Sequence, residues 1–145
     1  MLFSGSRELQ RVVVEAIAAA PEGAQTLDLV FTGMYAGASM IGGNRQWSRQ
    51  RAALLAANPS LMERELMKLS ALGTAVADVL VQRGVAELPA RVAAQAGVAV
   101  FAIGFDTWVG DEPPGDFAEC IRLGLVELRG LTAGGPLADA SSRSD

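Results

Sequence analysis

The segment from Val92 to Phe105 (VAAQAGVAVFAIGF) runs for fourteen residues without a charge, and it constrains the fold more than any other part of this chain. Wound as a helix, it presents two different apolar faces about 100° apart. The residues of the small face are Ala93, Gly97, Val100 and Gly104. The residues of the large face are Ala94, Val98, Phe101, Phe105 and Trp108. A helix this apolar is buried on more than one side, and a bilayer span needs about 20 residues, so protein must cover the second side. The segment is therefore either a central core helix or a helix shared between a core and a subunit interface.

The composition indicates one all-α domain. The chain has 145 residues, of which 50% are hydrophobic, and this is a common size for a domain with one core. Apolar residues recur with the period of a helix, and no stretch alternates as a half-buried strand does. The net charge is −4, with 12 basic and 16 acidic residues, which is not the charge of a nucleic-acid-binding surface. We therefore expect the chain alone not to bind duplex DNA.

Missing residue types exclude most catalytic sites. The chain has no histidine and one cysteine, Cys120, so neither an internal disulfide nor a zinc site of the usual Cys/His kind can form. A Ser-His-Asp or Cys-His arrangement is impossible, and no phosphate-binding glycine loop follows a strand. We expect no enzyme, no metal and no cofactor. The first residues lack the apolar core of a secretory signal and no segment is long enough for a membrane anchor, which predicts a cytoplasmic protein without membrane contact.

Capping and breaking residues divide the chain into six predicted helices. Their expected limits are Ser6 to about Ala20, Thr26 to Ile41, Arg45 to about Ala57, Ser60 to near Gly84, Ala90 to Gly110, and Asp116 to Leu131. Asn44 is expected to cap the third helix, and two capping boxes, beginning at Ser60 and at Asp116, open the fourth and the last. The fourth helix carries an apolar seam at Met62, Leu66, Leu69, Gly73, Val76 and Leu80. The small and polar residues 132–145 predict a disordered tail.

Several of these segments resemble a known family. The segment LFSGSREL at the start is similar to the end of a TetR-type DNA-binding unit. The segments ANPSLMERELMKLSALGTAVADVL, ARVAAQAGVAVFAIGFDTWV and FAECIRLGLVELRGL resemble the C-terminal effector domain of TetR-family regulators. The likeness extends from Leu2 to about Leu131 and is closest to actinobacterial members described as binding acyl-CoA-like ligands. It implies that residues 1–5 are the remnant of a helix-turn-helix border, that residues 6–131 form the ligand-binding and dimerisation domain, and that the three helices of the DNA reader are absent.

The resemblance implies a homodimer built by the last two helices, which form a four-helix bundle across a two-fold axis. The small face described above is suited to close approach of a second helix. The residues expected at this interface are Ala93, Gly97, Val100, Gly104, Phe117, Ile121 and Leu128. The alternative is that these residues only complete the core of one chain, because packing within a monomer uses the same pattern.

The resemblance also implies a ligand cavity enclosed by the middle helices. The candidate lining residues are Met34, Tyr35, Trp47, Arg51, Met62, Leu66, Phe101 and Phe105. Trp47 and Arg51 are one helical turn apart and offer an indole donor and a guanidinium that can bind a carboxylate or phosphate, while Tyr35 adds a hydroxyl. The alternative for the apolar members is plain core packing. The basic cluster of Arg45, Arg49 and Arg51 either binds an anion, solvates its helix or abuts a DNA-binding domain.

Two functions follow from these observations. The first is an effector-binding and dimerisation domain that senses a small hydrophobic or acyl-type ligand, with DNA as a partner only when the missing N-terminal domain is present. The second is a helical self-association module without a ligand, acting as a partner of full-length regulators. An enclosed cavity lined by the residues above favours the first, and a solid core favours the second.

Overall fold

The structure is a computed structural model that describes residues 6–133, and this part of the chain consists of helices joined by short loops. The helices are α1 (Ser6–Ala19), α2 (Thr26–Ile41), α3 (Arg45–Ala56), α4 (Pro59–Gln82), α5 (Glu87–Trp108) and α6 (Phe117–Thr132). The predicted all-α class and the six predicted helices are confirmed. The expectations for residues 1–5 and for the tail from residue 134 lie outside the described residues, and Thr132, which was expected in the tail, still belongs to α6.

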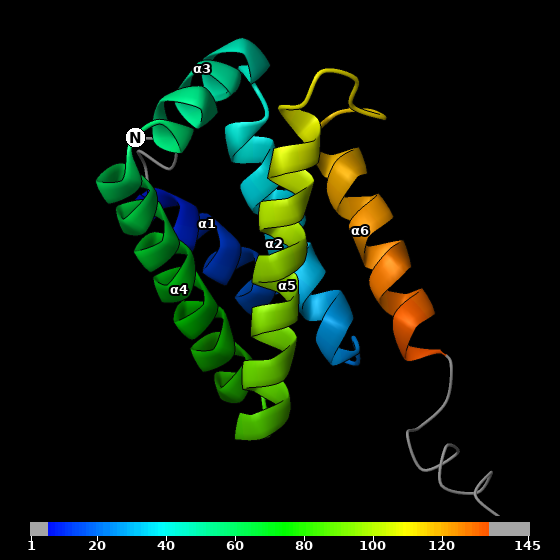
Figure 1. Ribbon diagram of the computed structural model, residues 1–145. Helices are drawn as coiled ribbons and strands as arrows, with labels where there is room; N and C mark the ends of the chain where they lie inside the picture. Colours follow the sequence, from blue (N-terminus) through cyan, green and yellow to red (C-terminus); the bar gives the residue numbers. More distant parts are fainter. Residues whose placement is uncertain (1–5, 134–145) are drawn as a thin grey trace, which may run out of the picture.

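The helices are arranged around α5. Figure 1 shows α4, α5 and α6 side by side, with α1 and α2 behind α5 and α3 lying across the top of the bundle. α5 contacts α2, α4 and α6, whereas α1 contacts α2 and α4. One outer side of α5 is left without a covering helix (Figure 1).

Both apolar faces of α5 are buried within one chain, as expected for a central core helix. Phe101 and Phe105, on the large face, are 0% and 3% exposed. On the small face, Gly97 lies against Val30 of α2 and Gly104 lies against Ile121 of α6. By length and composition α5 also resembles a membrane span, but half of its apolar window is buried inside the bundle. The burial of both faces identifies α5 as the core helix of a bundle.

Local capping residues fix two of the helix starts. The Asn44 side chain accepts a hydrogen bond from the backbone N–H of Trp47 (2.9 Å), and Asp116 accepts one from Glu119 (2.8 Å). Both predicted caps are confirmed. The capping box predicted at Ser60 is wrong, because α4 already begins at Pro59 after Asn58. Proline has no N–H to satisfy and a fixed φ, so it suits the first position of a helix.

The predicted seam of α4 is correct only in its second half. Val76 and Leu80 are fully buried, but Met62 and Leu66 are 37% and 58% exposed. In the first turns Glu65 turns inward instead, at 3% exposure, with its carboxylate 3.3 Å from Lys68 Nζ. An ion pair therefore takes the interior position that apolar periodicity had assigned to leucine and methionine.

Arg83 joins the end of α4 to the end of α1. Its guanidinium donates hydrogen bonds to the carbonyl oxygens of Ile17 (2.8 Å) and Ala20 (2.6 Å). Ile17 lies in the last turn of α1 and Ala20 directly follows the helix, where carbonyl groups lack the full set of intrahelical partners; the Ile17 carbonyl also accepts a hydrogen bond from the Ala20 N–H (3.3 Å). Arg83 thus stabilises the C-terminus of α1 by a contact between distant parts of the chain.

Candidate functional site

α3 is held to the bundle largely by polar contacts. Ser48 and Leu55 are its two buried side chains. Arg45 donates from Nε to the carbonyl oxygen of Trp108 (2.8 Å) and from Nη2 to that of Gly110. Arg49 forms an ion pair with Asp111 (2.9 Å). Two arginines of the predicted basic cluster therefore attach α3 to the end of α5 and the loop after it, where the unpaired carbonyls of a helix C-terminus attract cations.

Arg51, the third arginine of the cluster, has no such contact. The side chain is half-buried and its Nε is fully buried without a hydrogen-bond partner, unlike every other buried side-chain nitrogen or oxygen in the described residues. A buried donor without an acceptor costs about 1–3 kcal/mol, and such groups are rare in folded proteins. Trp47, one turn earlier on α3, is 39% exposed. The predicted Trp47–Arg51 pair thus combines an accessible indole with a cation that lacks an acceptor.

Three members of the predicted pocket lie in the core. Met34 and Phe101 are 0% exposed and Phe105 is 3% exposed. The ring of Phe117 lies 5.0 Å from Phe101, 5.6 Å from Phe105 and 5.2 Å from the stacked ring of Trp108, measured between centroids. These side chains form an aromatic cluster beneath the end of α5. In this structure they have the packing role that the alternative interpretation gave them.

The remaining members of the predicted pocket are not brought together. Met62 and Leu66 are exposed on α4. Tyr35 is half-buried on α2 and faces α6, where burial raises the pKa of its hydroxyl and the charges of Arg122, Glu119 and Arg129 act on it. An open groove between α4 and α5 and a smaller hollow at the loops after α1 and α4 contain none of the eight residues. The structure therefore groups Trp47 with Arg51 on α3, and groups Met34, Phe101 and Phe105 in the core.

The residues predicted for the dimer interface belong to the interior of one chain. A Cβ atom at Gly97 would lie 2.3 Å from Val30 Cγ1, and one at Gly104 would lie 3.1 Å from Ile121 Cγ1. The fully or nearly buried members of the set are Ala93, Gly97, Val100, Gly104, Phe117 and Ile121. Leu128 is partly buried against the same core. The small face is occupied by α2 and α6, so within one chain these residues have the core-packing role that the alternative interpretation gave them, and an interface that includes them stays a prediction.

Sequence reasoning missed the exposed apolar residues of the last two helices. On α5, Val92 and Ile103 are 61% and 62% exposed, and on α6, Val126 and Leu131 are 52% and 80% exposed. We call these four residues the outer apolar surface. The signal was present in the uncharged segment, because Val92, Ala99 and Ile103 recur at helical spacing on a third side of α5.

Neither a metal-ligand cluster nor an exposed thiol is present among residues 6–133. Within residues 6–133, no group of three or more histidine, cysteine, aspartate or glutamate side chains could hold a metal ion. Cys120 is buried, and burial raises the pKa of its thiol, with a further contribution from the carboxylates of Asp116 and Glu119. A raised thiol pKa lowers the fraction of the nucleophilic thiolate.

Comparison with known proteins identifies the family. The sequence pattern of the MftR C-terminal domain, a C-terminal domain of TetR-type regulators, matches residues 24–132, which include α3, the outer apolar surface and most of the core. No curated protein matches the chain at a significant level. TetR-type C-terminal domains generally dimerise and bind small effectors. Because the match covers well over half of the chain and the bundle has the expected helices, the chain belongs to the TetR family of regulators, within the group of MftR C-terminal domains.

Proposed function

We propose that this chain is the effector-binding and dimerisation domain of a TetR-like transcriptional regulator, that it acts in the cytoplasm, and that it senses a small hydrophobic or acyl-type ligand. The observation that carries the ligand part is the buried Nε of Arg51, which has no acceptor. A carboxylate or phosphate oxygen of a ligand would supply that acceptor once the half-buried side chain turns toward it. DNA is a partner only where a helix-turn-helix unit accompanies this domain, and no catalytic role is proposed.

In this proposal the ligand enters beneath α3. The Arg49–Asp111 ion pair can open at modest cost, because exposed ion pairs contribute about 0–1 kcal/mol. The part-buried hydrogen bonds of Arg45 to the carbonyl oxygens of Trp108 and Gly110 would keep α3 attached to the end of α5. The apolar part of the ligand would then replace contacts made by Met34, Phe101 and Phe105, and a methionine side chain adapts easily to a new neighbour. Met62 and Leu66, which are exposed on α4, are included in this proposal as candidate contacts of the ligand.

A thermal-shift screen tests this site. Acyl-CoAs, fatty acids and planar hydrophobic compounds are added to the wild-type chain and to Trp47→Ala, Arg51→Ala and Phe101→Leu. We expect a concentration-dependent rise in melting temperature with at least one acyl-type ligand, because a ligand that binds only the folded state stabilises it. The rise should shrink in each variant and persist in Arg64→Ala, which removes an exposed arginine of α4. A shift that survives all three site substitutions would contradict the location.

The dimer proposal uses the outer apolar surface. Val92 and Ile103 of α5 and Val126 and Leu131 of α6 are all more than half exposed, on the two helices that the family uses to dimerise. Exposed apolar side chains on neighbouring helices can form an interaction surface. In this proposal they take the place of the buried small face in the contact between subunits.

A second function, self-association without a ligand, is favoured by one observation. Met34, Phe101 and Phe105 fill the region where the cavity was expected, at exposures of 0–3%. If the chain forms dimers and no compound of the screen shifts its melting temperature, we would assign the chain the function of a self-association module in place of that of a sensing domain.

A further inference from the structure

The buried side of α3 is a narrow stripe with an arginine at each edge. Ser48 and Leu55 are 1% and 2% exposed, and Arg45 and Arg51 are half-buried. At about 100° per residue, Arg45 and Arg51 lie about 120° apart around the helix axis, with Ser48 and Leu55 between them. A rotation of α3 about its own axis therefore moves one of these two arginines toward the bundle and the other toward solvent.

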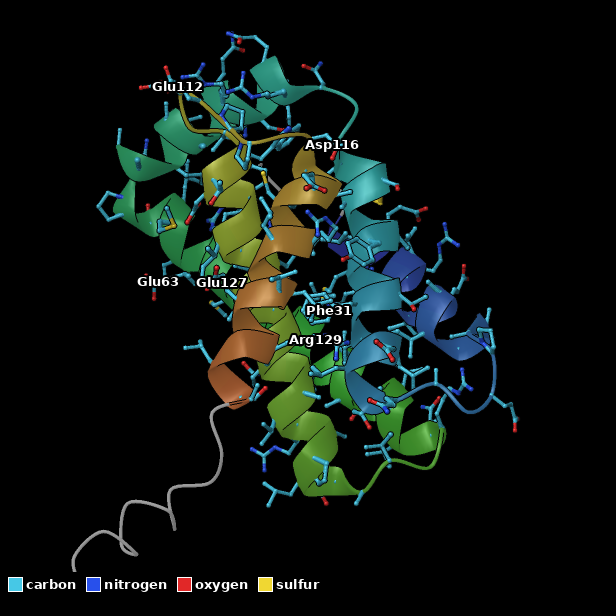
Figure 2. The ribbon with its side chains drawn as sticks, turned by 90° about the vertical axis from the view of Figure 1, so that its right-hand side faces the viewer. Phe31, Glu63, Glu112, Asp116, Glu127 and Arg129 are labelled. Atoms are coloured by element: carbon cyan, nitrogen blue, oxygen red, sulfur yellow. The ribbon has the colours of Figure 1, made fainter. Side chains whose placement is uncertain are left out.

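The edge that carries Arg45 is held by backbone acceptors at the end of α5. Arg45 donates from Nε to the carbonyl oxygen of Trp108 (2.8 Å) and from Nη2 to that of Gly110. Trp108 is the last residue of α5 and is 3% exposed, so its carbonyl oxygen belongs to a well-packed part of the bundle. Figure 2 shows the loop that follows, marked by Glu112 and Asp116, at the end of the bundle where α3 lies. The hydrogen bonds of Arg45 therefore fix the rotation of α3 at this edge.

The edge that carries Arg51 has no such contact. The Nε of Arg51 is fully buried and donates to no acceptor among the described residues. A buried donor without an acceptor destabilises the folded chain, and a rotation that carried Arg51 outward would bring this donor to water. The same rotation would move Arg45 away from the carbonyl oxygens at the end of α5. The hydrogen bonds of Arg45 therefore oppose the outward movement of Arg51.

We propose that Arg45 is a positioning residue of the effector site: it fixes the rotation of α3 and thereby keeps the Nε of Arg51 buried and available to an anionic group of the ligand. This inference rests on the proposed function, in which Arg51 binds a carboxylate or phosphate. Arg45 itself does not contact the ligand, because both of its hydrogen-bonding nitrogens are used by backbone carbonyls. A donor that is already held in place binds its acceptor without a further ordering cost.

Arg49 is the matched comparison for Arg45. It lies one helical turn later near the same edge of the stripe and also binds beyond the end of α5, to Asp111 (2.9 Å). The Asp111 side chain is 95% exposed, and an exposed ion pair holds its partners only weakly. Two arginines of one helix thus contact the same region through acceptors of different burial, and only Arg45 is expected to fix the rotation.

Exchange of the Arg51 Nε–H with water tests this inference. Nitrogen-15 NMR of the arginine side chains in the full chain measures it, and Arg51→Lys identifies the signal. In the wild-type chain this exchange should be about tenfold slower than that of Arg64, which is exposed on α4, because burial protects a donor from water. Arg45→Met should speed it about tenfold, since α3 is then able to rotate. Arg49→Met should leave it nearly unchanged.

Further variants distinguish positioning from a general loss of stability. Arg45→Lys keeps a cation without the two-pronged guanidinium and should restore part of the protection of Arg51. Urea unfolding reports the stability of each variant, and a merely structural role of Arg45 would change unfolding without a selective change at Arg51. If Arg45→Met does not fold, Arg45→Gln provides the same test. Unchanged Arg51 exchange in the folded variant, or equal acceleration by Arg49→Met, would overturn the inference.

Titration with dodecanoate, which joins a carboxylate to an apolar chain, connects this result to the effector site. Arg45→Met should raise the dissociation constant about fivefold, because the donor is no longer held in place, and Arg49→Met should leave it unchanged. Faster Arg51 exchange with an unchanged dissociation constant would overturn the role of Arg45 in binding. A wild-type chain that binds no compound of the thermal-shift screen contradicts the proposed function, whereas the exchange of Arg51 still decides whether Arg45 positions it.

Discussion

The substitution Gly97→Ala tests whether the small face of α5 packs inside one chain. The new Cβ atom would lie 2.3 Å from Val30 Cγ1 and 3.2 Å from Met34 Cε. Val30 is fully buried and β-branched, so it has essentially one rotamer in a helix and α2 must shift instead. Overpacking a core costs about 1–3 kcal/mol, and replacing glycine by alanine within a helix returns about 1 kcal/mol. Because the nearest atom is rigid, we expect a net loss of about 1–2 kcal/mol in the free energy of unfolding.

Urea unfolding followed by circular dichroism measures this loss at one fixed protein concentration. In thermal unfolding of the same variant, the expected drop in melting temperature is about 2–8 °C for a domain of this size. Val30→Ala should relieve part of the cost, and a double-mutant cycle should give a coupling of about 1 kcal/mol or more. Gly130→Ala is the control, because nothing lies within 4 Å of its new Cβ atom and stability should stay the same or rise slightly. A Gly97→Ala variant with unchanged unfolding but a weakened dimer would refute intrachain packing and restore the partner-facing interpretation.

Three further predictions test particular contacts. Arg83→Met should lower the free energy of unfolding by about 2 kcal/mol, because the carbonyl oxygens of Ile17 and Ala20 lose a charged donor; Arg64→Met, at an exposed position, should leave urea unfolding unchanged. Gly84→Ala should cost about 1–2 kcal/mol, since its φ of 97° is unfavourable for a residue with a Cβ atom, whereas Gly43→Ala has open space and an ordinary φ and should be neutral. Cys120 should react with a disulfide reagent far more slowly in the folded chain than in denaturant, because burial raises its thiol pKa and the thiolate forms only as the pH rises toward that value; equal rates in the two states would show that the thiol is accessible.

The parts of the fold that depend on local sequence could be predicted. Asn44 and Asp116 bind backbone N–H groups three residues ahead, so a short sequence window is sufficient to recognise them. The two apolar faces of α5 could also be predicted, because helical periodicity indicates which sides of a helix are buried. At Ser60 the same approach failed, since Pro59 starts the helix one residue earlier.

The candidate site was less predictable because it depends on which elements meet. Periodicity shows that Gly97 is buried, but it cannot distinguish α2 of the same chain from a helix of a second chain, since both use the same ridges and grooves. Glu65 takes an inward position that an apolar pattern assigns to Leu66. The missing acceptor of Arg51 depends on the positions of all surrounding atoms, which a sequence pattern does not give. Arg45 and Arg49 reach acceptors at the end of α5 and in the loop after it, whereas Arg51 does not.

Hydrogen exchange of the α3 amides, measured with and without the acyl-type ligand that gives the largest thermal shift, tests the central claim most directly. If the domain senses its effector beneath α3, the amides of Arg45–Ala56 should change their protection at least tenfold on binding, and the buried turns of α5 should keep theirs. The change should disappear in Arg51→Ala. Saturating ligand that leaves α3 exchange unaltered while it protects another helix would contradict the account.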